Sequence, residues 1–357
     1  MVLMVGVDVH KDTHTAVVVD QLGVRRAQRR VQATDAGHLE LLAWVQGVGE
    51  EFAVAAGPEI EWAVEDCRHV SLRLERALLA AGQRVRRVPP KLMAGARSSA
   101  REFGKSDPID ATAIARAALR EPDLPLAEHT PASRELKLLV DHREHLVAER
   151  TAMICRLRWH LHELDPELER SIPARGLDKP TRLAWLAEHL PAAHPGLVGE
   201  LAAELVGDIA ARTTRIRALE REIARRVAVL APQLLELPGC GPLSAAKLLA
   251  ETARPGRFRS EACFAMHAGV APIPASSGRT DRHRLARGGN RQLNAALHRI
   301  ALTQTRLPES LGRAYYDKRR ARGDRHNDAL RALKRRLARV VFNLLRQTEP
   351  TPTPAAA

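Results

Sequence analysis

Residues 2–34 read VLMVGVDVHKDTHTAVVVDQLGVRRAQRRVQAT, and this stretch decides the fold of the N-terminal part. The apolar run at 2–9 predicts a buried strand, HKDTH predicts a polar turn, and residues 15–21 predict a second strand. A Leu-Gly turn then leads into a third strand. The sequence therefore begins with three antiparallel strands, a β-meander.

Helices and short strands alternate after the meander, as far as the prolines at 122 and 125. Thr34 or Asp35 can cap the first helix, and Gly82 can end the second. The expected elements are a helix from residue 35, a strand at 52–56, a helix through 72–79, a strand at 84–90 and a helix at 108–120. Three antiparallel strands followed by alternating helix and strand indicate an α/β layer fold. The ribonuclease-H-like fold has this order.

The middle of the chain is polar and predicts two long helices, at 133–168 and 204–230. Each carries apolar residues seven positions apart, which favours a helical hairpin or a coiled coil. The stripes are Leu139, Leu146 and Met153, and Ile209, Ile216, Ile223 and Leu230. Arg143 and Arg150 interrupt the first stripe, and a proline-containing loop is expected between the helices.

The composition changes again from residue 236, and residues 268–290 have a loop-like composition. Two basic helices are expected at about 291–304 and 325–347. The expected domains are an α/β domain at 1–126, a helical or coiled-coil connector at 127–232, a mostly helical domain at 233–347 and a disordered tail at 348–357.

Positive charge is concentrated at one end of the chain. The net charge of the whole sequence is +14, whereas residues 254–347 alone carry 22 Lys or Arg and 6 Asp or Glu, a net of +16. A cationic C-terminal part favours a polyanionic partner such as nucleic acid. An arginine-rich proteome is the alternative explanation, but it would not place the excess at one end. With 3% aromatic residues, base stacking is not the main binding mode expected.

Four scattered cysteines form no CxxC pair, which fits a reducing compartment and argues against a zinc ribbon. The sequence has no stretch typical of a membrane span and no signal-peptide pattern at its start. We therefore expect a cytoplasmic protein with no membrane partner.

Carboxylates stand at three points of the N-terminal domain. Asp8 ends the first strand, Glu65 follows the strand at 52–56, and Asp107 and Asp110 lie three residues apart at the start of a helix. On one side of a helix the two aspartates would repel each other unless a cation lies between them. These four acids offer enough oxygen ligands for two magnesium ions, which can support phosphodiester cleavage.

Each carboxylate also has a purely structural interpretation. Asp8 can pair with a nearby arginine or backbone N–H, and Asp107 can simply cap the helix that starts at Pro108. Near Glu65, three other acids compete for its role: Glu59, Glu61 and Asp66.

The succession GVDVHKDTH, WAVED, VRRVPP and GKSDPIDA resembles the DEDD transposases of bacterial insertion sequences, in the group numbered one-ten. The resemblance covers about residues 3–347 and implies a bacterial protein associated with the nucleoid. It implies a ribonuclease-H-like, RuvC-like N-terminal domain in which Asp8, Glu65, Asp107 and Asp110 hold Mg²⁺, as two ions, or Mn²⁺ in its place. One departure is that Asp66 and Cys67 stand where the family usually has a Thr-Gly-like pair.

The segment LPGCGPLSAAKLL resembles a helix–hairpin–helix element, in which Gly239 and Gly241 would let backbone N–H groups approach a phosphate. A simple glycine turn between helices is the alternative.

The segment AGVAPIPASSGRTDRHRLARGGN places two serines beside clustered arginines, and a serine attacks best where cations clamp its target phosphate. A solvated linker is the structural alternative. The resemblance implies that Ser277, rather than Ser276, is the nucleophile that links covalently to DNA, and that a guide RNA, the bridge RNA, pairs with donor and target DNA. The arginines expected to bind nucleic acid are Arg279, Arg282, Arg284 and Arg287.

The last basic helix carries apolar residues on one face, and we expect Lys334, Arg335, Arg336 and Arg339 to contact phosphates from the other. A solvated cationic face without a ligand is the alternative.

The sequence thus favours an insertion-sequence transposase that cuts and rejoins donor and target DNA, with a structured guide RNA as partner, acting as a dimer or tetramer. The alternative is a metal-dependent, resolvase-like nuclease that forms no covalent serine intermediate. A non-catalytic binding protein would tolerate loss of Asp107 and Asp110. A tyrosine recombinase using Tyr315 or Tyr316 would leave the acidic domain without a role.

Overall fold

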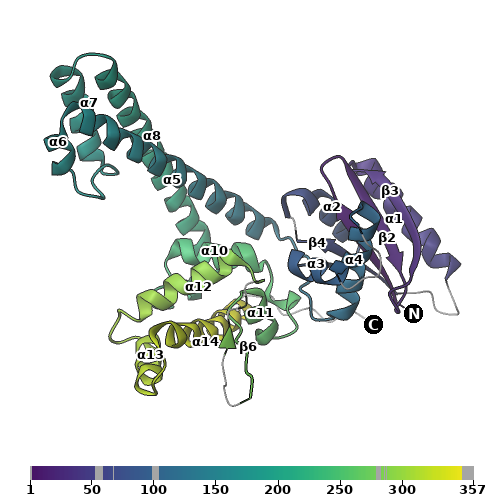
Figure 1. Ribbon diagram of the computed structural model, residues 1–357. Coiled ribbons are helices and arrows are strands. Elements are labelled where there is room, and N and C mark those ends of the chain that lie inside the picture. The colour runs from purple at the N-terminus through teal and green to yellow at the C-terminus, as the bar shows by residue number, and fades with distance from the viewer. Residues whose placement is uncertain are drawn as a thin grey trace. The chain divides into compact units, whose positions relative to one another are not determined.

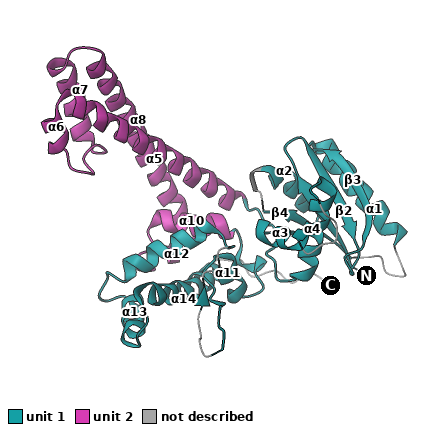
Figure 2. Cartoon of the chain, in the orientation of Figure 1, with its two compact units in different colours: residues 1–130, 253–357 teal, residues 131–252 magenta. Residues whose placement is uncertain are grey.

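The structure is a computed structural model that describes residues 2–52, 59–66, 68–98, 104–278, 283–284, 286 and 288–347. The chain forms two compact units (Figure 2). Unit 1 comprises residues 1–130 and 253–357, and unit 2 comprises residues 131–252. Unit 1 contains a mixed α/β sheet region from the N-terminal part and a helical region from the C-terminal part, and unit 2 is helical.

Five strands of the N-terminal part form one mixed sheet in the order β3-β2-β1-β4-β5 (Figure 1). The strands are β1 (Val2–Val9), β2 (Thr13–Val19), β3 (Arg25–Gln32), β4 (Glu59–Glu65) and β5 (Arg84–Val88). The first three are antiparallel neighbours, so the predicted β-meander is confirmed. β4 runs parallel to β1, and β5 runs parallel to β4.

Helices cover both faces of this sheet. They are α1 (Asp35–Glu51), α2 (Arg68–Ala80), α3 (Pro90–Ser98) and α4 (Asp107–Arg120). Odd-numbered residues of β1 such as Leu3 and Val5 pack in a core with Leu41 of α1 and Leu74 of α2. Met4 faces the other way and packs in a second core with α4. The alternation of side chains along a strand therefore assigns each β1 residue to one helical layer.

The predicted cap of α1 is confirmed, because the Thr34 hydroxyl accepts a hydrogen bond from the Gly37 N–H at 3.1 Å. Two other details differ from expectation. The strand expected at 52–56 falls mostly outside the described residues, Phe52 ends α1, and the strand beside β1 is β4. The residues after β5 form α3, which was not predicted.

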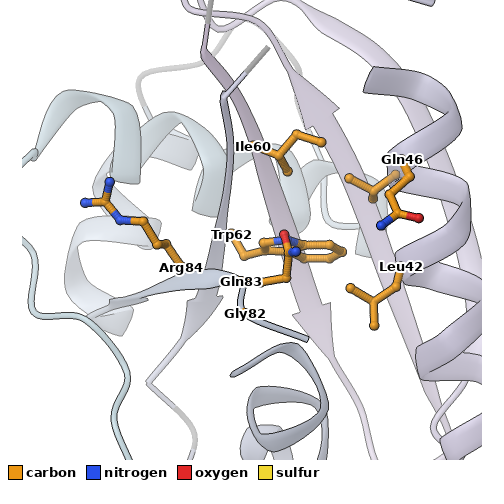
Figure 3. A pocket seen from close by; sticks show the side chains of 8 residues that line it. Leu42, Gln46, Ile60, Trp62, Gly82, Gln83 and Arg84 are labelled. Atoms are coloured by element: carbon orange, nitrogen blue, oxygen red, sulfur yellow. The ribbon is translucent and has the colours of Figure 1, made fainter. Parts of the chain in front are cut away.

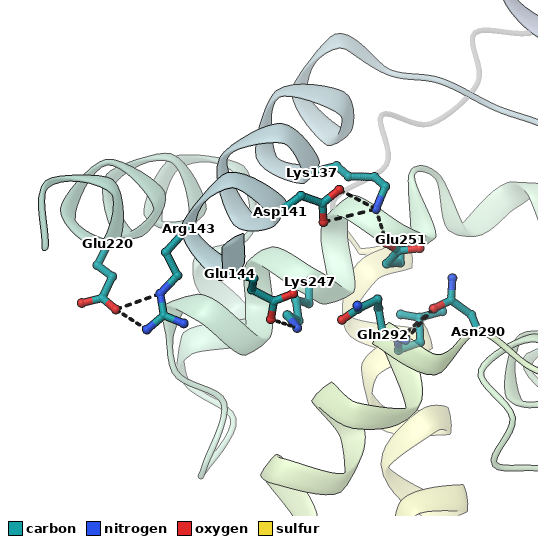
Figure 4. A network of polar contacts seen from close by, with 10 residues as sticks. Lys137, Asp141, Arg143, Glu144, Glu220, Lys247, Glu251, Asn290 and Gln292 are labelled. Carbon is teal, nitrogen blue, oxygen red and sulfur yellow. Dashed lines mark hydrogen bonds and ion pairs between the residues drawn. The ribbon is translucent and has the colours of Figure 1, made fainter. Parts of the chain in front are cut away.

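Unit 2 is built on two long helices, α5 (Pro131–Leu164) and α8 (Leu197–Leu230). Ile209, Ile216 and Ile223 are buried, as the seven-residue spacing predicts, whereas Leu230 at the end of the stripe is exposed. The arginines that interrupt the α5 stripe pair with residues of α8. Arg143 donates to Glu220 at 2.5 Å (Figure 4). Arg150 donates to the Thr213 hydroxyl at 3.2 Å. On the outer side of α5, Trp159 is 73% exposed.

The proline-containing loop expected between these helices is wrong. That region forms α6 (Pro166–Ser171) and α7 (Pro180–Ala193). Pro180 stands in the first turn of α7, where its missing N–H is harmless. Leu183, Leu186 and Leu190 of α7 are buried against α8, and burying this apolar side offsets the presence of Pro191 inside the helix.

Unit 2 ends with α9 (Pro232–Leu235) and α10 (Pro242–Thr252). Two ion pairs join α10 to α5: Lys137 to Glu251 at 2.9 Å, and Lys247 to Glu144 (Figure 4). The compact unit therefore extends beyond residue 232, where we placed the end of the connector. The functional division of the chain stays a prediction.

The C-terminal part of unit 1 is mostly helical. Its elements are a short 3₁₀ turn (Pro255–Arg257), α11 (Glu261–His267), β6 (Ile273–Pro274), β7 (His283–Arg284), α12 (Arg291–Gln304), α13 (Leu311–Ala321) and α14 (His326–Arg346). Both predicted basic helices are present as α12 and α14, whereas α13 was not predicted. The expected disordered tail lies outside the described residues.

Within the described residues, no helix combines the length and the apolar character that a membrane span requires.

Candidate active site

Asp8 lies near the carboxyl end of β1, on the face of the sheet that α4 covers. Side chains alternate along a strand, so Asp8 shares this face with Met4 and Gly6. It is 7% exposed. A carboxylate this buried needs a cation or hydrogen-bond donors beside it.

Glu65 ends the neighbouring strand β4. Because β1 and β4 are parallel with Val7 beside Val64, the next positions along the two strands bring Asp8 and Glu65 side by side. Glu61 has a different role, since Arg86 of β5 pairs with its carboxylate at 2.6 Å. The structure therefore separates two acids that the sequence left as competitors.

Asp107 and Asp110 come from the first turn of α4. The expected capping role of Asp107 is wrong: Asp107 is the first helical residue, Ser106 occupies the cap position, and the Ser106 side chain makes no cap hydrogen bond. The Asp107 carboxylate is thus available for other partners.

Gly6 allows α4 to approach the sheet closely enough for this arrangement. A Cβ atom at position 6 would lie 2.1 Å from the carbonyl oxygen of Ala111 and 2.7 Å from the backbone nitrogen of Ala115. Only a residue without a side chain fits between β1 and α4 at this point. The contact fixes the first turn of α4 over the end of β1.

The other three acids act electrostatically on Asp8. Burial raises the pKa of Asp8 to about 6; His10 opposes this rise, and Asp110, Asp107 and Glu65 add to it. A raised carboxyl pKa in a cluster of acids shows how poorly the protein alone tolerates the negative charge.

A divalent cation fits this cluster. Within the part of the chain that the structure describes, oxygen atoms of Asp8 and Asp107 and a ring nitrogen of His10 lie within 4.8 Å of one another. Carboxylate oxygens are the ligands that Mg²⁺ and Mn²⁺ prefer, and an added positive charge would relieve the repulsion on Asp8.

His10 stands in this cluster, and the sequence did not predict it there. Its Nδ1 lies 3.7 Å from the Asp8 carboxylate. We interpreted HKDTH only as a polar turn, although two residues after Asp8 is the spacing at which an extended chain returns to the same face. That spacing was the available signal.

A separate pocket of about 310 Å³ lies on the opposite face of the sheet (Figure 3). Trp62 lines it, and its indole N–H donates to the Gln83 side chain at 2.9 Å. Because Trp62 packs in the core shared with α1 and α2, this pocket is not part of the carboxylate cluster.

Ser277 and Ser276 lie exposed between the short strands β6 and β7. Gly269 and Gly289, which stand before and after this segment, are in close backbone contact. A Cβ atom at Gly289 would lie 2.3 Å from the Cα of Gly269. The Asn290 side chain then caps α12 by accepting from two backbone N–H groups. The two serines therefore lie in a loop whose ends are in contact.

Of the four arginines expected around Ser277, Arg284 is exposed in β7. Arg279, Arg282 and Arg287 lie outside the described residues.

The basic side chains of α14 have more varied environments than expected. Lys334 is buried rather than on an open face, and its ammonium donates to the Asn294 side chain at 3.1 Å. Arg335 and Arg339 both hydrogen-bond to Glu261 of α11, while Arg336 stacks over the ring of Tyr315. Burial and the nearby Arg331 lower the pKa of Lys334.

Several of these cations line a pocket of about 940 Å³ in the C-terminal part of unit 1. Its basic lining residues are Arg284, Arg319, Arg325, Arg331, Lys334 and Arg335. Asp324 and Asp328 also line the pocket and pair with Arg319 and Arg331, so positive charge is in excess but partly neutralised. A concave surface with an excess of positive charge attracts phosphate groups.

Gly239 and Gly241 lie in the turn between α9 and α10, in unit 2. Gly239 has a φ of +81°, which glycine adopts without strain, and nothing lies within 4 Å of the Cβ position of Gly241. Such open space beside the start of α10 suits the close approach of a ligand.

A carboxylate cluster that could hold a divalent cation and a strongly basic C-terminal part are together typical of enzymes that act on nucleic-acid phosphodiester bonds. Residues 5–166 match a family described as transposase, of the DEDD IS110 type, and residues 231–317 match the family described as transposase IS116/IS110/IS902.

Similar proteins also come from insertion elements or are described as transposases. The chain is 30% identical to an uncharacterized 42 kDa protein of insertion element IS900 from Mycobacterium paratuberculosis, covering 99% of this chain and 98% of the relative. It is also 30% identical to an uncharacterized 44.8 kDa protein of insertion element IS116 from Streptomyces clavuligerus, covering 99% and 97%. A probable family 20 transposase of Pseudomonas aeruginosa is 31% identical, covering 50% of this chain and 52% of the relative. This chain belongs to the IS110 family of insertion-sequence transposases, enzymes that cut and rejoin DNA.

Proposed function

We propose that this transposase uses Asp8, Glu65, Asp107 and Asp110 to hold two Mg²⁺ ions in a ribonuclease-H-like, RuvC-like domain. The observation that carries the proposal is that ligand atoms of Asp8, Asp107 and His10 lie within 4.8 Å of one another. Asp110 and Glu65 are close enough to add to the rise that burial causes in the pKa of Asp8. The strand order, with an antiparallel meander followed by two parallel strands, supports the fold assignment. The family's use of divalent metal agrees with it.

The ions would neutralise charge on the scissile phosphate and on the leaving oxygen. Residues of the chain supply the remaining requirements. Glu65 and Asp8 hold fixed positions because adjacent strands carry them, and Asp107 and Asp110 are fixed by the packing of α4 on Gly6. The rigid backbone of the site restricts which phosphate geometry fits.

Ser277 is the proposed nucleophile of strand exchange. Its Oγ would attack the DNA phosphorus, so that the Oγ–P bond forms while the bond from phosphorus to a deoxyribose oxygen breaks. The serine gives up its proton and the leaving oxygen gains one. Its exposure in the segment between β6 and β7, the strand that carries the exposed Arg284, supports this role.

Nucleic acid would be held at the basic C-terminal pocket and at the turn with Gly239 and Gly241. Both donor and target DNA and a structured bridge RNA are proposed partners, with the protein acting as a dimer or tetramer. The concentration of positive charge in residues 254–347 supports binding through phosphates. We expect purified protein to carry RNA and to lose DNA affinity steeply as salt rises.

An in-vitro recombination assay tests the catalytic assignments, using the full protein, donor and target DNA, and RNA from the element's flanks. We expect Asp110→Asn to abolish strand cutting while DNA binding persists. We expect Ser277→Ala to remove the covalent protein–DNA species that denaturing gels detect, whereas Ser276→Ala retains it.

A resolvase-like nuclease remains the second candidate function. The acid cluster favours this function, because metal-dependent cleavage at the acids needs no serine nucleophile. Cutting by Ser277→Ala at the rate of the unmodified protein would establish it, and would refute the serine mechanism while leaving the metal site intact.

A further inference from the structure

Asp110 already has a cationic partner within the protein. The Nη1 of Arg97 donates to its Oδ1 at 2.9 Å. Asp110 is 7% exposed, so this is an ion pair with one buried end, and the Arg97 side chain is 33% exposed at the other. The pair therefore reaches from the acid cluster outward to solvent.

Arg97 lies in the last turn of α3, and α3 is anchored independently of this ion pair. Ala96, the preceding residue, is buried in the core that α4 shares with the sheet. The guanidinium stands on a long side chain with several rotatable bonds, so it can leave Asp110 without any movement of α3. The α3 backbone is therefore fixed, whereas the charged end of Arg97 can change its partner.

The position of Arg97 conflicts with a cation bound by the same acids. A guanidinium in contact with Asp110 repels a divalent ion coordinated by that carboxylate or by its neighbours, and a partly buried site screens this repulsion weakly. In the protein alone, the guanidinium supplies positive charge that Asp110 needs beside Asp8 and Asp107.

We propose that Arg97 is an exchangeable counter-ion: it neutralises Asp110 in the metal-free protein, leaves when a divalent cation binds, and then contacts a phosphate of the bound DNA strand. This inference rests on the proposed metal site. The planar guanidinium of Arg97 pairs with a phosphate as well as with a carboxylate, so the same side chain can make both contacts. Its exchange would couple metal loading to capture of the DNA strand.

Calorimetric titration of Mn²⁺ into the full-length protein without DNA tests the first half of the proposal. We expect Arg97→Gln to bind Mn²⁺ at least about 5-fold more tightly than the unmodified protein, since the competing charge is gone. Arg97→Lys keeps the charge and should bind Mn²⁺ nearly as weakly as the unmodified protein. The matched control is Arg116→Gln on α4, whose side chain donates to the Gly23 carbonyl at 2.9 Å, and its affinity should not change.

Thermal unfolding checks that the variant folds. Arg97→Gln should melt lower than the unmodified protein without metal, because Asp110 has lost its partner, and saturating Ca²⁺ should remove most of that difference. DNA affinity in an electrophoretic mobility assay tests the second half. The variant should bind DNA more weakly, roughly 5-fold or more, with Ca²⁺ present, and like the unmodified protein without it.

The possible contrary results have distinct meanings. Equal or weaker Mn²⁺ binding by Arg97→Gln overturns the exchange, because Arg97 would then be neutral toward the metal or would hold Asp110 in place for it. Equal DNA affinity in the presence of Ca²⁺ overturns the phosphate contact. Absence of Mn²⁺ binding by the unmodified protein contradicts the proposed metal site itself, and the inference with it.

Discussion

Two carboxylates of the acid cluster, Asp8 and Glu65, lie on strands, and the face of the sheet that each occupies brings it to the cluster. Asp8 and Glu65 share one face of the sheet with α4, and the two neighbouring strands end at nearly the same level. Glu61 shares that face too, but it lies nearer the start of β4 and pairs with Arg86. Two glutamates four residues apart therefore have different environments.

Replacing each glutamate by glutamine tests this difference. Glu65→Gln should weaken Mn²⁺ binding by roughly 100-fold or more with little change in stability, since a ligand is lost. Glu61→Gln should leave Mn²⁺ affinity unchanged and lower the free energy of unfolding by about 2 kcal/mol, because Arg86 loses its buried partner. Calorimetric titration and urea unfolding measure the two effects, and an exchange of the two outcomes would reverse the assignment.

A buried histidine pair makes the sheet domain sensitive to acid. The Nε2 atoms of His14 on β2 and His38 on α1 lie 3.2 Å apart, and both residues are almost fully buried. Burial and the neighbouring His38 lower the pKa of His14 to about 4. The unfolded chain therefore binds a proton near pH 6.5 that the folded chain rejects until about pH 4.

Stability from His14 is thus fully present above about pH 6.5 and is lost as the pH falls toward 4. The loss is at most roughly 3 kcal/mol. We expect His14→Gln to flatten the pH dependence of the unfolding free energy in this window, measured by urea unfolding at pH 7.0 and 4.5. An unchanged slope would show that His14 is not the group that titrates.

At the scale of elements, the contact between β1 and α4 carries the site. The sequence predicted both elements, since one has an apolar run and the other a proline in its first turn. It could not predict that they touch at Gly6, because a glycine within a strand has no pattern that distinguishes a close contact from a weak point. It also left Glu61 and Glu65 unresolved, since only the pairing with β5 tells them apart.

Gly6→Ala tests this contact. The added methyl group must push α4 away from the sheet, so we expect a loss of about 3 kcal/mol in the free energy of unfolding and a matching loss of Mn²⁺ affinity as Asp107 and Asp110 shift. Gly47→Ala on α1 is the control: nothing lies within 4 Å of its Cβ position, and alanine should stabilise the helix by about 0.5–1 kcal/mol. Equal effects of the two substitutions would refute the argument.

Long helices were the easiest elements to predict and their partners the hardest. Arg143 and Arg150 looked like defects in the α5 stripe, yet they pair with residues of α8 that are more than 60 positions away in sequence. The helices α3 and α13 were missed because each is short and starts or ends among prolines, glycines or charges, and α7 was missed because it contains Pro191. Tertiary contacts, rather than local periodicity, stabilise them.

At the scale of the molecule, the compact unit at 131–252 includes α10, which the composition had assigned to the C-terminal domain. The unit has a hydrophobic core of its own, with buried residues from α5, α7 and α8. The ion pairs of α10 with Glu144 and Lys137 lie within the same unit. Cooperative folding should therefore depend on α10.

Two fragments test this expectation by circular dichroism. Residues 131–252 expressed alone should be helical and should unfold in one cooperative transition. Residues 131–232, which lack α10, should melt several degrees lower, since two ion pairs and the packing of α10 are lost. Equal melting temperatures would show that α10 contributes nothing to this unit.

The four tryptophans fall into two pairs. Trp44 and Trp62 report on unit 1, and Trp159 and Trp185 report on unit 2. Trp62 lies fully buried in the sheet with Trp44 half-buried nearby in sequence, while Trp159 is widely exposed and Trp185 is 41% exposed on the helices of unit 2. No tryptophan occurs after residue 185. Intrinsic fluorescence should therefore resolve into a blue component from the sheet and a red component from the helical unit. Quenching by iodide would remove the red component first, giving each unit an optical signal without any label.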